Sequence, residues 1–319
     1  MKAVRLQHAR GPITLDRVDV PEPGPGEVRV RMEACGICHT ELFVASLPKL
    51  GLSPLTLGHE GIARVDAVGP DVSDWSIGDR AGMTFLATTC GVCDCCRNGA
   101  ERFCAKQVNF GFSAHGALSE FAVVPARSLV RVPEGIDAAS LAPMCCAGWT
   151  AYGAMRKASL FAGQSVAIFG YGGLGHLAVQ LAKLQGLRVA VADSSPAKLE
   201  HARAAGAEPV AKGYDAAIVF TGNPAAIPEA FKVVRRQGTL VIVGISNTNY
   251  ELPLIDTIVK GARIRGSYLG TKDDLAEVFR LAADGALKAH ITPTTIDEAP
   301  ETLTRLHEGQ VEGRAVVRF

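Results

Sequence analysis

The segment Ser165-Val166-Ala167-Ile168-Phe169-Gly170-Tyr171-Gly172-Gly173-Leu174-Gly175 decides how the central part of this chain folds. It begins with a short apolar run, continues with glycines in the spacing Gly-x-Gly-x-x-Gly, and is followed by apolar residues at helical spacing, Leu177, Ala178, Leu181 and Ala182. A strand, a tight glycine turn and a helix in this order are typical of a dinucleotide-binding unit. The first glycine permits the turn, the second lets a pyrophosphate approach the backbone, and the third lets helix pack on strand.

The alternation of strand and helix continues after this segment and predicts a parallel sheet with helices on its faces. Apolar runs at 187–192, 216–220 and 239–243 are the expected strands, Ser195-Pro196 opens a helix, and Gly206 is placed to end it. One connection is too short for this pattern. If residues 207–210 form a strand, only 211–215 link it to the next strand, whereas a parallel crossover needs a dozen or more residues. We therefore expect a strand or its crossover helix to be missing here, which leaves a reduced sheet.

Asp193 ends the second expected strand, 18 residues after Gly175. An acidic side chain at this place can hold the adenosine ribose hydroxyls and would repel a 2′-phosphate. Ser194 and Ser195 follow without an arginine, so the sequence favours NAD over NADP. The alternative is that Asp193 only caps the next helix.

The first third of the chain predicts a separate, mostly antiparallel β domain. Short apolar runs at 1–6, 13–18 and 27–34 are divided by Gly and Pro, and the third run alternates apolar with polar residues at Val28, Val30, Met32 and Ala34. A length of 319 residues also suits two domains better than one.

The strongest metal-binding signal is Cys90-x2-Cys93-x2-Cys96-x7-Cys104, four thiols within fifteen residues. Four thiolates fill every position of a tetrahedral Zn²⁺, so the expected site is closed to substrate and structural. Cys95 lies inside the loop out of register with these four. Chance clustering or disulfides are the alternative.

A second metal set is spread along the chain: Cys38, His59 and either Cys145 or Cys146. Two thiolates and a neutral imidazole leave one position of Zn²⁺ open, which suits polarisation of an alcohol or carbonyl oxygen. Spacing alone does not bring these residues together. His59 could equally be a buried structural histidine and the cysteine pair small core residues.

Composition excludes several other classes of function. With 33 basic and 32 acidic residues, a net charge of +1 gives no field that would recruit nucleic acid or an anionic membrane. No run of about 18 apolar residues predicts a membrane span, and the N-terminal residues lack a signal-peptide pattern. Nine cysteines without a secretion signal indicate a reducing compartment, so we expect a cytoplasmic protein with a small-molecule partner.

Taken in order along the chain, these motifs resemble the zinc-dependent alcohol dehydrogenases of the medium-chain dehydrogenase/reductase superfamily. The resemblance runs nearly end to end and is carried by residues 36–40, 58–61, 68–80, the four-cysteine lobe, 142–148, the glycine turn and Gly313-Arg314. It implies a GroES-like catalytic domain from 1–147 and 270–319, with a structural zinc lobe at 90–104, and a Rossmann NAD domain at 148–269. It also implies a homodimer or homotetramer.

The resemblance assigns roles to individual residues. In the pattern Ala-Pro-x-x-Cys-Ala-Gly the zinc ligand falls on Cys146, so Cys145 is an extra thiol. Glu60 is implied as the carboxylate that transiently replaces substrate or water at the metal, and Thr40 as the acceptor of the alcohol proton. The implied cofactor contacts are His39, Gly170, Gly172, Gly173, Leu174, Gly175, Asp193, Gly244, Ile245, Ser267, Leu269 and Arg314.

Two residues depart from the family pattern. Phe43 stands where a histidine completes the proton relay, and Glu41 stands where the usual residue is Asp, which puts its support of His59 in question. The expected function is the reversible oxidation of a primary or secondary alcohol, or reduction of an aldehyde or ketone, with NAD and two zinc ions per chain. The alternatives are an NADP-linked aldehyde or ketone reductase, a non-catalytic NAD-binding zinc protein and, against the balanced charge, a nucleic-acid zinc module.

Overall fold

The computed structural model describes residues 1–319 and divides into two compact units. Unit 1 comprises Met1–Cys146, Leu275–Asp284 and Ala289–Phe319, and unit 2 comprises Ala147–Asp274 and Gly285–Lys288. The domain limits expected from the sequence, 1–147 with 270–319 for one domain and 148–269 for the other, stay a prediction.

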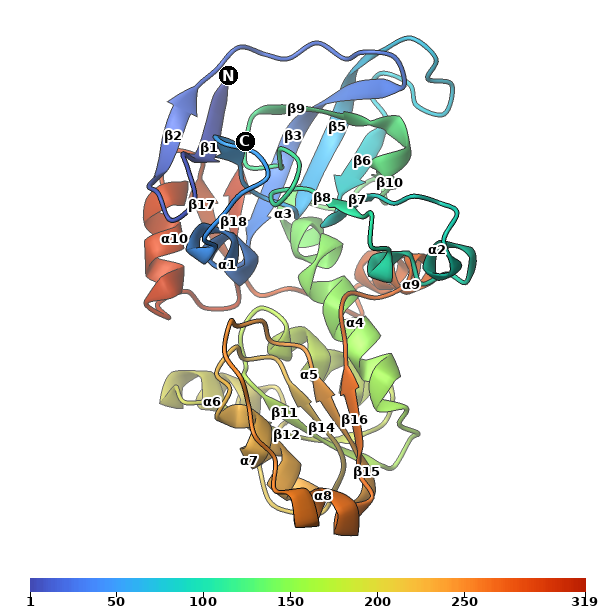
Figure 1. The fold of residues 1–319 in the computed structure, drawn as a ribbon, viewed down its shortest axis with the longest axis vertical. Coiled ribbons are helices and arrows are strands. Elements are labelled where there is room, and N and C mark those ends of the chain that lie inside the picture. The colour runs from blue at the N-terminus through green and yellow to red at the C-terminus, as the bar shows by residue number, and fades with distance from the viewer. The chain divides into compact units, whose positions relative to one another are not determined.

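Unit 1 is built on a seven-stranded sheet in the order β10-β6-β5-β3-β18-β17, with β9 also paired to β3. All its pairs are antiparallel except β17 with β18, which confirms a mostly antiparallel domain. In Figure 1 the red C-terminal elements lie among the blue N-terminal ones. The strands are β3 (Glu27–Ile37), β5 (Gly61–Val68), β6 (Arg80–Met83), β9 (Phe121–Pro125), β10 (Val130–Arg131), β17 (Ile291–Thr295) and β18 (Arg314–Arg318).

Shorter elements complete unit 1 around one apolar core, to which β3 contributes Val28, Val30 and Met32 at the expected period of two. The other strands are β1 (Lys2–Leu6), β2 (Ile13–Arg17), β4 (Leu55–Thr56), β7 (Leu86–Thr88) and β8 (Val108–Asn109). The helices are α1 (His39–Ser46), α2 (Asp94–Arg97), α3 (Ala138–Leu141) and α10 (Ala299–His307), with 3-10 turns η1 (Glu101–Phe103), η2 (Ala126–Ser128) and η3 (Ala142–Cys145). Helix α9 (Lys272–Ala283) begins in unit 2 and ends in unit 1.

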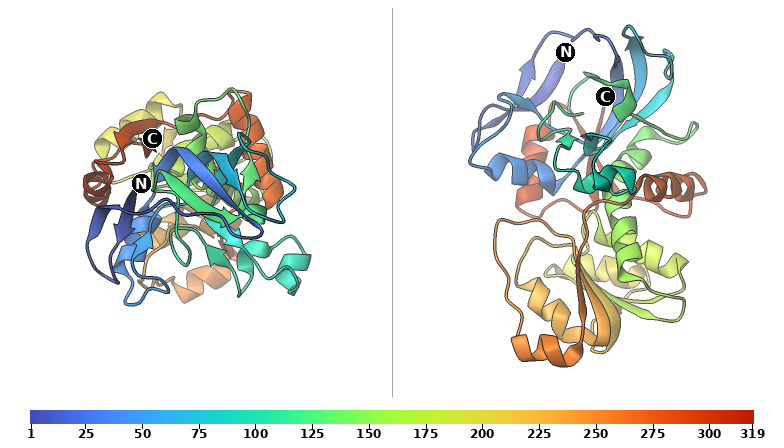
Figure 2. Two further views of the ribbon diagram at one scale, coloured as in Figure 1. Left: turned by 90° about the horizontal axis from the view of Figure 1, so that it is seen from above. Right: turned by 45° about the vertical axis from the view of Figure 1, so that its right-hand side comes forward.

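Unit 2 is a six-stranded parallel sheet in the order β13-β12-β11-β14-β15-β16, as the alternating pattern predicts. Helices flank it on both sides (Figures 1 and 2). The strands are β11 (Ser165–Phe169), β12 (Arg188–Ala192), β13 (Glu208–Pro209), β14 (Tyr214–Val219), β15 (Val234–Ile242) and β16 (Arg263–Gly266). The helices are α4 (Ala147–Ala158), α5 (Gly175–Leu184), α6 (Pro196–Ala204), α7 (Ala226–Val233) and α8 (Leu254–Lys260).

The short connection after β13 contains no helix, but the strand that precedes it, β13, is present. Residues 210–213 join β13 to β14 without a helix, as expected, whereas the sheet keeps six strands because a two-residue β13 still pairs with β12. The reduction therefore falls on the crossover and not on the number of strands. Inside this link the Ala211 N–H donates to the Tyr214 hydroxyl at 3.1 Å, and Val210 packs against the core of unit 2.

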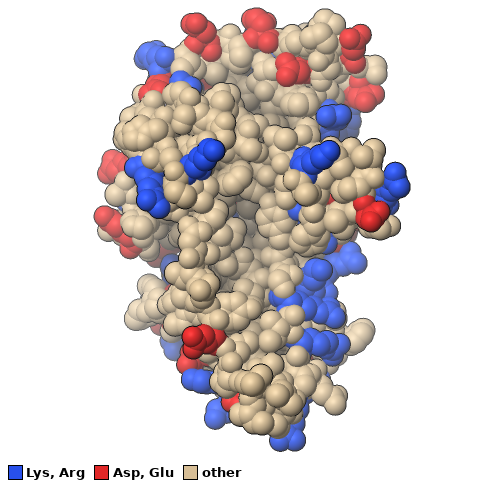
Figure 3. All heavy atoms as spheres, viewed as in Figure 1, with Lys and Arg blue, Asp and Glu red and all other residues tan.

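Charge distribution and helix character can be described for the whole chain. Both signs of charge occur on the face shown in Figure 3, and much of that face is uncharged. None of the helices combines the length and the apolar character that crossing a lipid bilayer requires.

Candidate metal centres and dinucleotide site

The sheet of unit 1 brings the dispersed metal set together. Cys38 directly follows β3, and His59 and Glu60 directly precede β5; because Cys35 of β3 pairs with Gly61 of β5, these two strand ends meet. Cys146 reaches the same place from the end of η3. One ligand atom from each of Cys38, His59, Glu60 and Cys146 lies within 4.8 Å of all the others, and all four residues are buried.

The structure distinguishes the two adjacent cysteines. Cys146 belongs to the metal set, whereas the Cys145 thiol points to the Gly61 carbonyl oxygen at 3.7 Å, and burial raises its pKa. Cys145 is therefore a core thiol outside the metal set.

Glu41 supports this set from the first turn of α1. Its Oε1 lies 2.7 Å from His59 Nδ1, and its Oε2 accepts a hydrogen bond of 2.6 Å from the Cys38 backbone N–H. Both Glu41 and His59 are only 1% exposed. A glutamate thus reaches His59 from this position despite the family preference for Asp.

Glu60 shares its buried position with Arg314. Pairing of β18 with β3 sets Ala315 opposite Ile37, which places Arg314 Nη2 3.3 Å from Glu60 Oε1 and lets Nη1 donate to the Ile37 carbonyl at 3.2 Å. A Cβ on Gly36 would overlap the Glu60 carboxylate, so only glycine leaves room for it. Burial raises the pKa of Glu60 to about 8, and the Arg314 guanidinium opposes that rise. The phosphate contact implied for Arg314 stays a prediction.

The donor chemistry of this cluster fits Zn²⁺. His59 Nε2 and both Glu60 carboxylate oxygens are buried without a hydrogen-bond partner, which is costly unless a cation satisfies them. A hydrogen bond from the Cys146 thiol holds the pKa of the Cys38 thiol well below its usual range; burial opposes this, and Arg314 and His59 add to it. A thiolate, a second thiol and an imidazole lone pair are the ligand types of an open zinc site.

The neighbours of the set include the expected proton acceptor and two aromatic rings. Thr40 Oγ1 lies 3.5 Å from Cys38 Sγ, while the adjacent His39 is exposed. The Phe85 ring meets the His59 imidazole edge-on at 5.1 Å between centroids, and the Phe112 ring is 6.3 Å from Phe85. Neither ring follows from a sequence motif, because only the spatial contacts with His59 and between the two rings bring them to this set.

The four-cysteine lobe forms the second cluster. The Sγ atoms of Cys93 and Cys96 are 3.5 Å apart, those of Cys90 and Cys104 are 3.6 Å apart, and all four lie within 4.8 Å of one another. A disulfide needs about 2.05 Å, whereas tetrahedral Zn–S bonds of 2.3 Å place sulfurs about 3.8 Å apart. Hydrogen bonds from the backbone N–H groups of residues 92 and 93 lower the pKa of Cys90 to about 6. Free thiols at this spacing fit a closed zinc site, and Cys95 lies outside it.

The glycine turn of unit 2 has the geometry that a bound pyrophosphate needs. Gly170 has a φ of 97°, and a Cβ on Gly175 would overlap the Gly170 carbonyl oxygen. Helix α5 begins at Gly175, so its free N–H groups and dipole face this turn.

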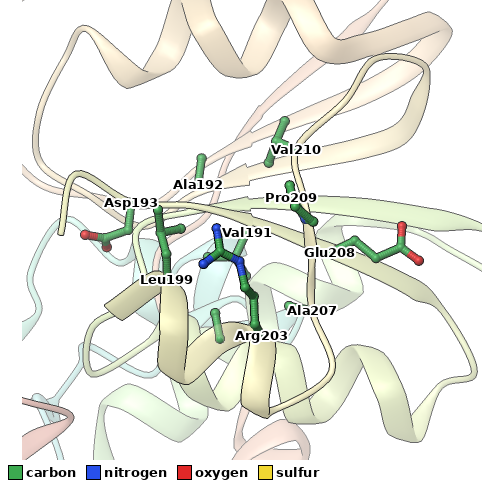
Figure 4. A pocket seen from close by; sticks show the side chains of 10 residues that line it. Val191, Ala192, Asp193, Leu199, Arg203, Ala207, Glu208, Pro209 and Val210 are labelled. Carbon is green, nitrogen blue, oxygen red and sulfur yellow. The ribbon is translucent and has the colours of Figure 1, made fainter. Parts of the chain in front are cut away.

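Asp193 lies at the end of β12, beside the glycine turn. Its Oδ2 accepts from the Tyr171 N–H at 2.7 Å and its Oδ1 from the Ser195 N–H at 2.9 Å, whereas the N-cap of α6 is Ser195 itself. Asp193 therefore ties the turn to the start of α6 and keeps further lone pairs for ribose hydroxyls. It also borders a recess of about 220 Å³ lined by α6, β12 and β13, which Arg203 enters as well (Figure 4).

The remaining implied cofactor residues follow the ends of two neighbouring strands. Gly244 and Ile245 follow β15, and Ser267 and Leu269 follow β16. Because all six strands are parallel, these residues share the carboxyl edge of the sheet with the glycine turn and Asp193, which is where open α/β sheets bind ligands.

Comparison with known proteins places these features in a family. A model of the alcohol dehydrogenase GroES-like domain matches residues 24–134, and a model of the zinc-binding dehydrogenase domain matches residues 173–284. An alcohol dehydrogenase of Geobacillus stearothermophilus is 36% identical over 338 aligned positions that cover 100% of this chain and 99% of the relative. One from Rhizobium meliloti (strain 1021) is 35% identical, with 99% and 98% coverage.

Solved structures agree with these matches. An alcohol dehydrogenase from the archaeon Aeropyrum pernix has a TM-score of 0.91 and 32% identity, and all of both chains is covered. An acetophenone reductase from Geotrichum candidum, solved in complex with NAD, has a TM-score of 0.91 and 30% identity, covering 100% of this chain and 97% of that one.

The alignment with the Geobacillus protein uses 338 positions for 319 residues, so at least 19 positions of that alignment have no residue here.

Proposed function

Because this chain belongs to the zinc-dependent alcohol dehydrogenases of the medium-chain dehydrogenase/reductase superfamily, it is a zinc-dependent oxidoreductase of alcohols, and we propose that its hydride acceptor is NAD. The substrate class is a primary or secondary alcohol, with the aldehyde or ketone as product. The observation that carries the zinc-dependent chemistry is the buried convergence of Cys38, His59 and Cys146, in which His59 Nε2 has no hydrogen-bond partner.

We assign Cys38, His59 and Cys146 to the catalytic zinc and Glu60 to its transient ligation. Zinc, when bound, supplies Lewis acidity toward the substrate oxygen, and NAD accepts the hydride. The Thr40 hydroxyl, beside Cys38 at the start of α1, accepts the proton that the alcohol loses. Phe43 occupies the relay-histidine position, so the proton then leaves Thr40 through water or the exposed His39.

The choice of NAD rests on Asp193. Its carboxylate would hold the ribose hydroxyls and repel a 2′-phosphate. NADP is the second candidate, because Arg203 lines the same recess as Asp193 (Figure 4). The Arg203 side chain is 57% exposed and pairs with Glu200 at 3.6 Å. An exposed ion pair of this kind is weak, so the guanidinium can turn from Glu200 toward a phosphate. Comparison of kcat/KM for NAD and NADP decides between them, and a preference for NADP would contradict the proposal.

We further propose two zinc ions per chain, because the four-cysteine lobe offers a closed site beside the open one. The direct test is zinc analysis coupled to an NADH-formation screen over alcohols of increasing chain length. Two zinc ions with turnover are the expected result. Zinc and NAD binding without any turnover would favour a non-catalytic binding protein.

We propose a homodimer formed through one surface of unit 2. Strand β16 is an outer strand of the sheet, and the neighbouring helix α8 exposes 76% of Leu254, 66% of Ile255 and 65% of Ile258. An unpaired strand edge and an exposed apolar helix are suited to pairing with a second copy. Replacement of Leu254 and Ile258 by Glu should yield monomers in sedimentation velocity; an unchanged oligomer would contradict this interface.

We also propose a reducing, cytoplasmic location, which the nine unpaired thiols support.

A further inference from the structure

The segment 267–271, which leaves β16, has two features typical of a ligand site. The Ser267 hydroxyl is buried and has no hydrogen-bond partner, which is costly unless a bound group satisfies it. Leu269 has a φ of 53°, a left-handed backbone that a leucine rarely adopts, and it is only 5% exposed. Backbone of this kind persists only where its surroundings hold it, and such positions cluster at ligand sites.

The strand order indicates which end of a dinucleotide would meet this segment. The glycine turn follows β11 and Asp193 follows β12, so the pyrophosphate and the adenosine ribose would lie at that side of the sheet. In the order β12-β11-β14-β15-β16, the last strand is four strand spacings from β12, about 19 Å. An extended dinucleotide that lies across the carboxyl edge therefore brings its nicotinamide end toward residues 267–271.

One face of α4 packs on this segment. Trp149, Gly153 and Arg156 are spaced by four and three residues, which places them on the same side of the helix. Helix α4 and the chain that leaves β16 lie side by side (Figure 1), and a Cβ on Gly153 would overlap the Leu269 carbonyl oxygen. A Cβ on Gly270 would likewise overlap the Trp149 ring. Glycine at both positions therefore allows α4 to pack directly on the segment.

Polar contacts hold the segment in addition to this packing. Trp149 is 3% exposed, and its Nε1–H donates to the Thr271 carbonyl at 2.6 Å. Arg156 Nη1 lies 2.7 Å from Asp274 Oδ1, while Asp274 Oδ2 accepts from the Thr271 N–H at 2.8 Å. The Asp274 N–H donates in turn to Thr271 Oγ1 at 3.1 Å, which completes a capping box at the start of α9. The Thr271 backbone is thus held at its carbonyl by Trp149 and at its N–H by Asp274.

We propose that α4 positions the nicotinamide end of the cofactor, with Trp149 as the main positioning residue, by holding residues 269–271 in the conformation that receives the nicotinamide. This inference rests on the proposed function, because it concerns the cofactor proposed there. Trp149 and Arg156 act through the backbone of 269–274 and need not touch the cofactor. Loss of the Trp149 donor lets the strained backbone at Leu269 relax, which weakens binding of the nicotinamide but not of the ADP-ribose part of the cofactor.

Trp149→Phe is the first test, because it keeps a large aromatic ring and removes the Nε1–H donor. The measurements are the calorimetric Kd values of NADH and of ADP-ribose, which lacks the nicotinamide, and neither requires turnover. We expect the Kd of NADH to rise about 10-fold, the size of one lost hydrogen bond, while the Kd of ADP-ribose stays within about twofold of wild type.

Arg156→Met is the second test and does not disturb the buried ring. The Arg156 side chain is 60% exposed, so its replacement removes the ion pair with Asp274 at little risk to folding. Because an exposed ion pair is weak, we expect the Kd of NADH to rise about 3-fold, again with an unchanged Kd of ADP-ribose.

Trp75→Phe is the matched control. Trp75 is the other tryptophan of the chain, and its Nε1–H also donates to a backbone carbonyl, that of Ala126 at 3.1 Å within unit 1. This variant should leave both Kd values unchanged. Equal weakening of NADH and ADP-ribose in the Trp149 and Arg156 variants, or no change for either ligand, would overturn the inference.

The wild-type protein distinguishes that result from a failure of the proposed function. Binding of NADPH and 2′-phospho-ADP-ribose in place of NADH and ADP-ribose would overturn the choice of NAD, and the ratio of Kd values for that pair would then test the inference. A wild-type protein that binds none of the four ligands would overturn the proposed function, and this inference with it.

Discussion

The two cysteine clusters of unit 1 are built in opposite ways. The four-cysteine lobe draws all its ligands from residues 90–104, and three of the four are partly exposed. The open set draws Cys38, His59 and Cys146 from distant parts of the chain, and every member is buried. In the lobe a bound metal would organise the chain, whereas in the open set the sheet organises the residues before any metal binds. Removal of each ligand set should therefore have different consequences.

The largest expected effect is on turnover in Cys38→Ser. Loss of a zinc ligand removes the Lewis acid, so kcat/KM for alcohol oxidation should fall about 1,000-fold or more. The thermal unfolding midpoint and the affinity for NAD, measured by calorimetry, should change little because unit 2 holds the glycine turn and Asp193. Cys95→Ser is the control and should keep full activity, because Cys95 lies outside both clusters. Full activity in Cys38→Ser would refute the zinc mechanism.

The reverse pattern is expected in the lobe. Cys93→Ser opens the closed site, and residues 90–104 contain little apolar material to hold their shape without zinc. We expect a loss of about 2–4 kcal/mol in stability, seen as a midpoint lower by roughly 5–15 °C, and rapid proteolysis within the lobe. Zinc should fall by one ion, with kcat reduced less than in Cys38→Ser. A protease-resistant lobe without its zinc would show that the metal does not organise it.

Gly36→Ala tests how tightly the sheet defines the open site. The added Cβ overlaps the Glu60 carboxylate and displaces it from Arg314, while the zinc ligands stay in place. We expect kcat to fall about 10–100-fold, with two zinc ions retained and a stability loss of about 1–3 kcal/mol. An unchanged kcat would mean that Glu60 has no part in turnover.

The smallest effect should come from Cys145→Ser, which exchanges a buried thiol beside a zinc ligand for a hydroxyl. Because the Cys145 sulfur makes only a long contact with the Gly61 carbonyl, we expect a loss of about 1–2 kcal/mol and unchanged zinc content. Loss of one zinc ion in Cys145→Ser, measured by elemental analysis, would show that the structure has assigned the wrong cysteine of the pair.

The same contrast explains what the sequence could predict. The lobe is local, so its spacing alone predicted the four cysteines that the structure brings together. The open set depends on the register of β3 with β5, which no local pattern encodes, and spacing left Cys145 and Cys146 equivalent until the resemblance and then the structure separated them. The role of Gly36 was hidden for the same reason, because it acts through Glu60, which is distant in sequence. The resemblance pointed to Glu41 as a support of His59, but its contact with the Cys38 N–H was not predicted.

The cofactor unit shows a different limit. Its parallel sheet and glycine turn follow from periodicity and motif, and the length of the link after Val210 correctly excluded a crossover helix. The length of this link could not decide whether the strand before it, expected at residues 207–210, is present in the sheet. Strand β13 has only two residues, too few to show a pattern, and is held by pairing with β12.

The distance along the chain between Cys38 and Cys146 also sets an order of events. The lobe closes a short loop, which costs little entropy, so it can capture zinc while the rest of the chain is still unfolded. The open set does not exist until β3, β5 and η3 have assembled, and its members are then buried. The two clusters therefore differ in what they require before they can take up zinc: the lobe needs only its own fifteen residues, whereas the open set needs the assembled sheet.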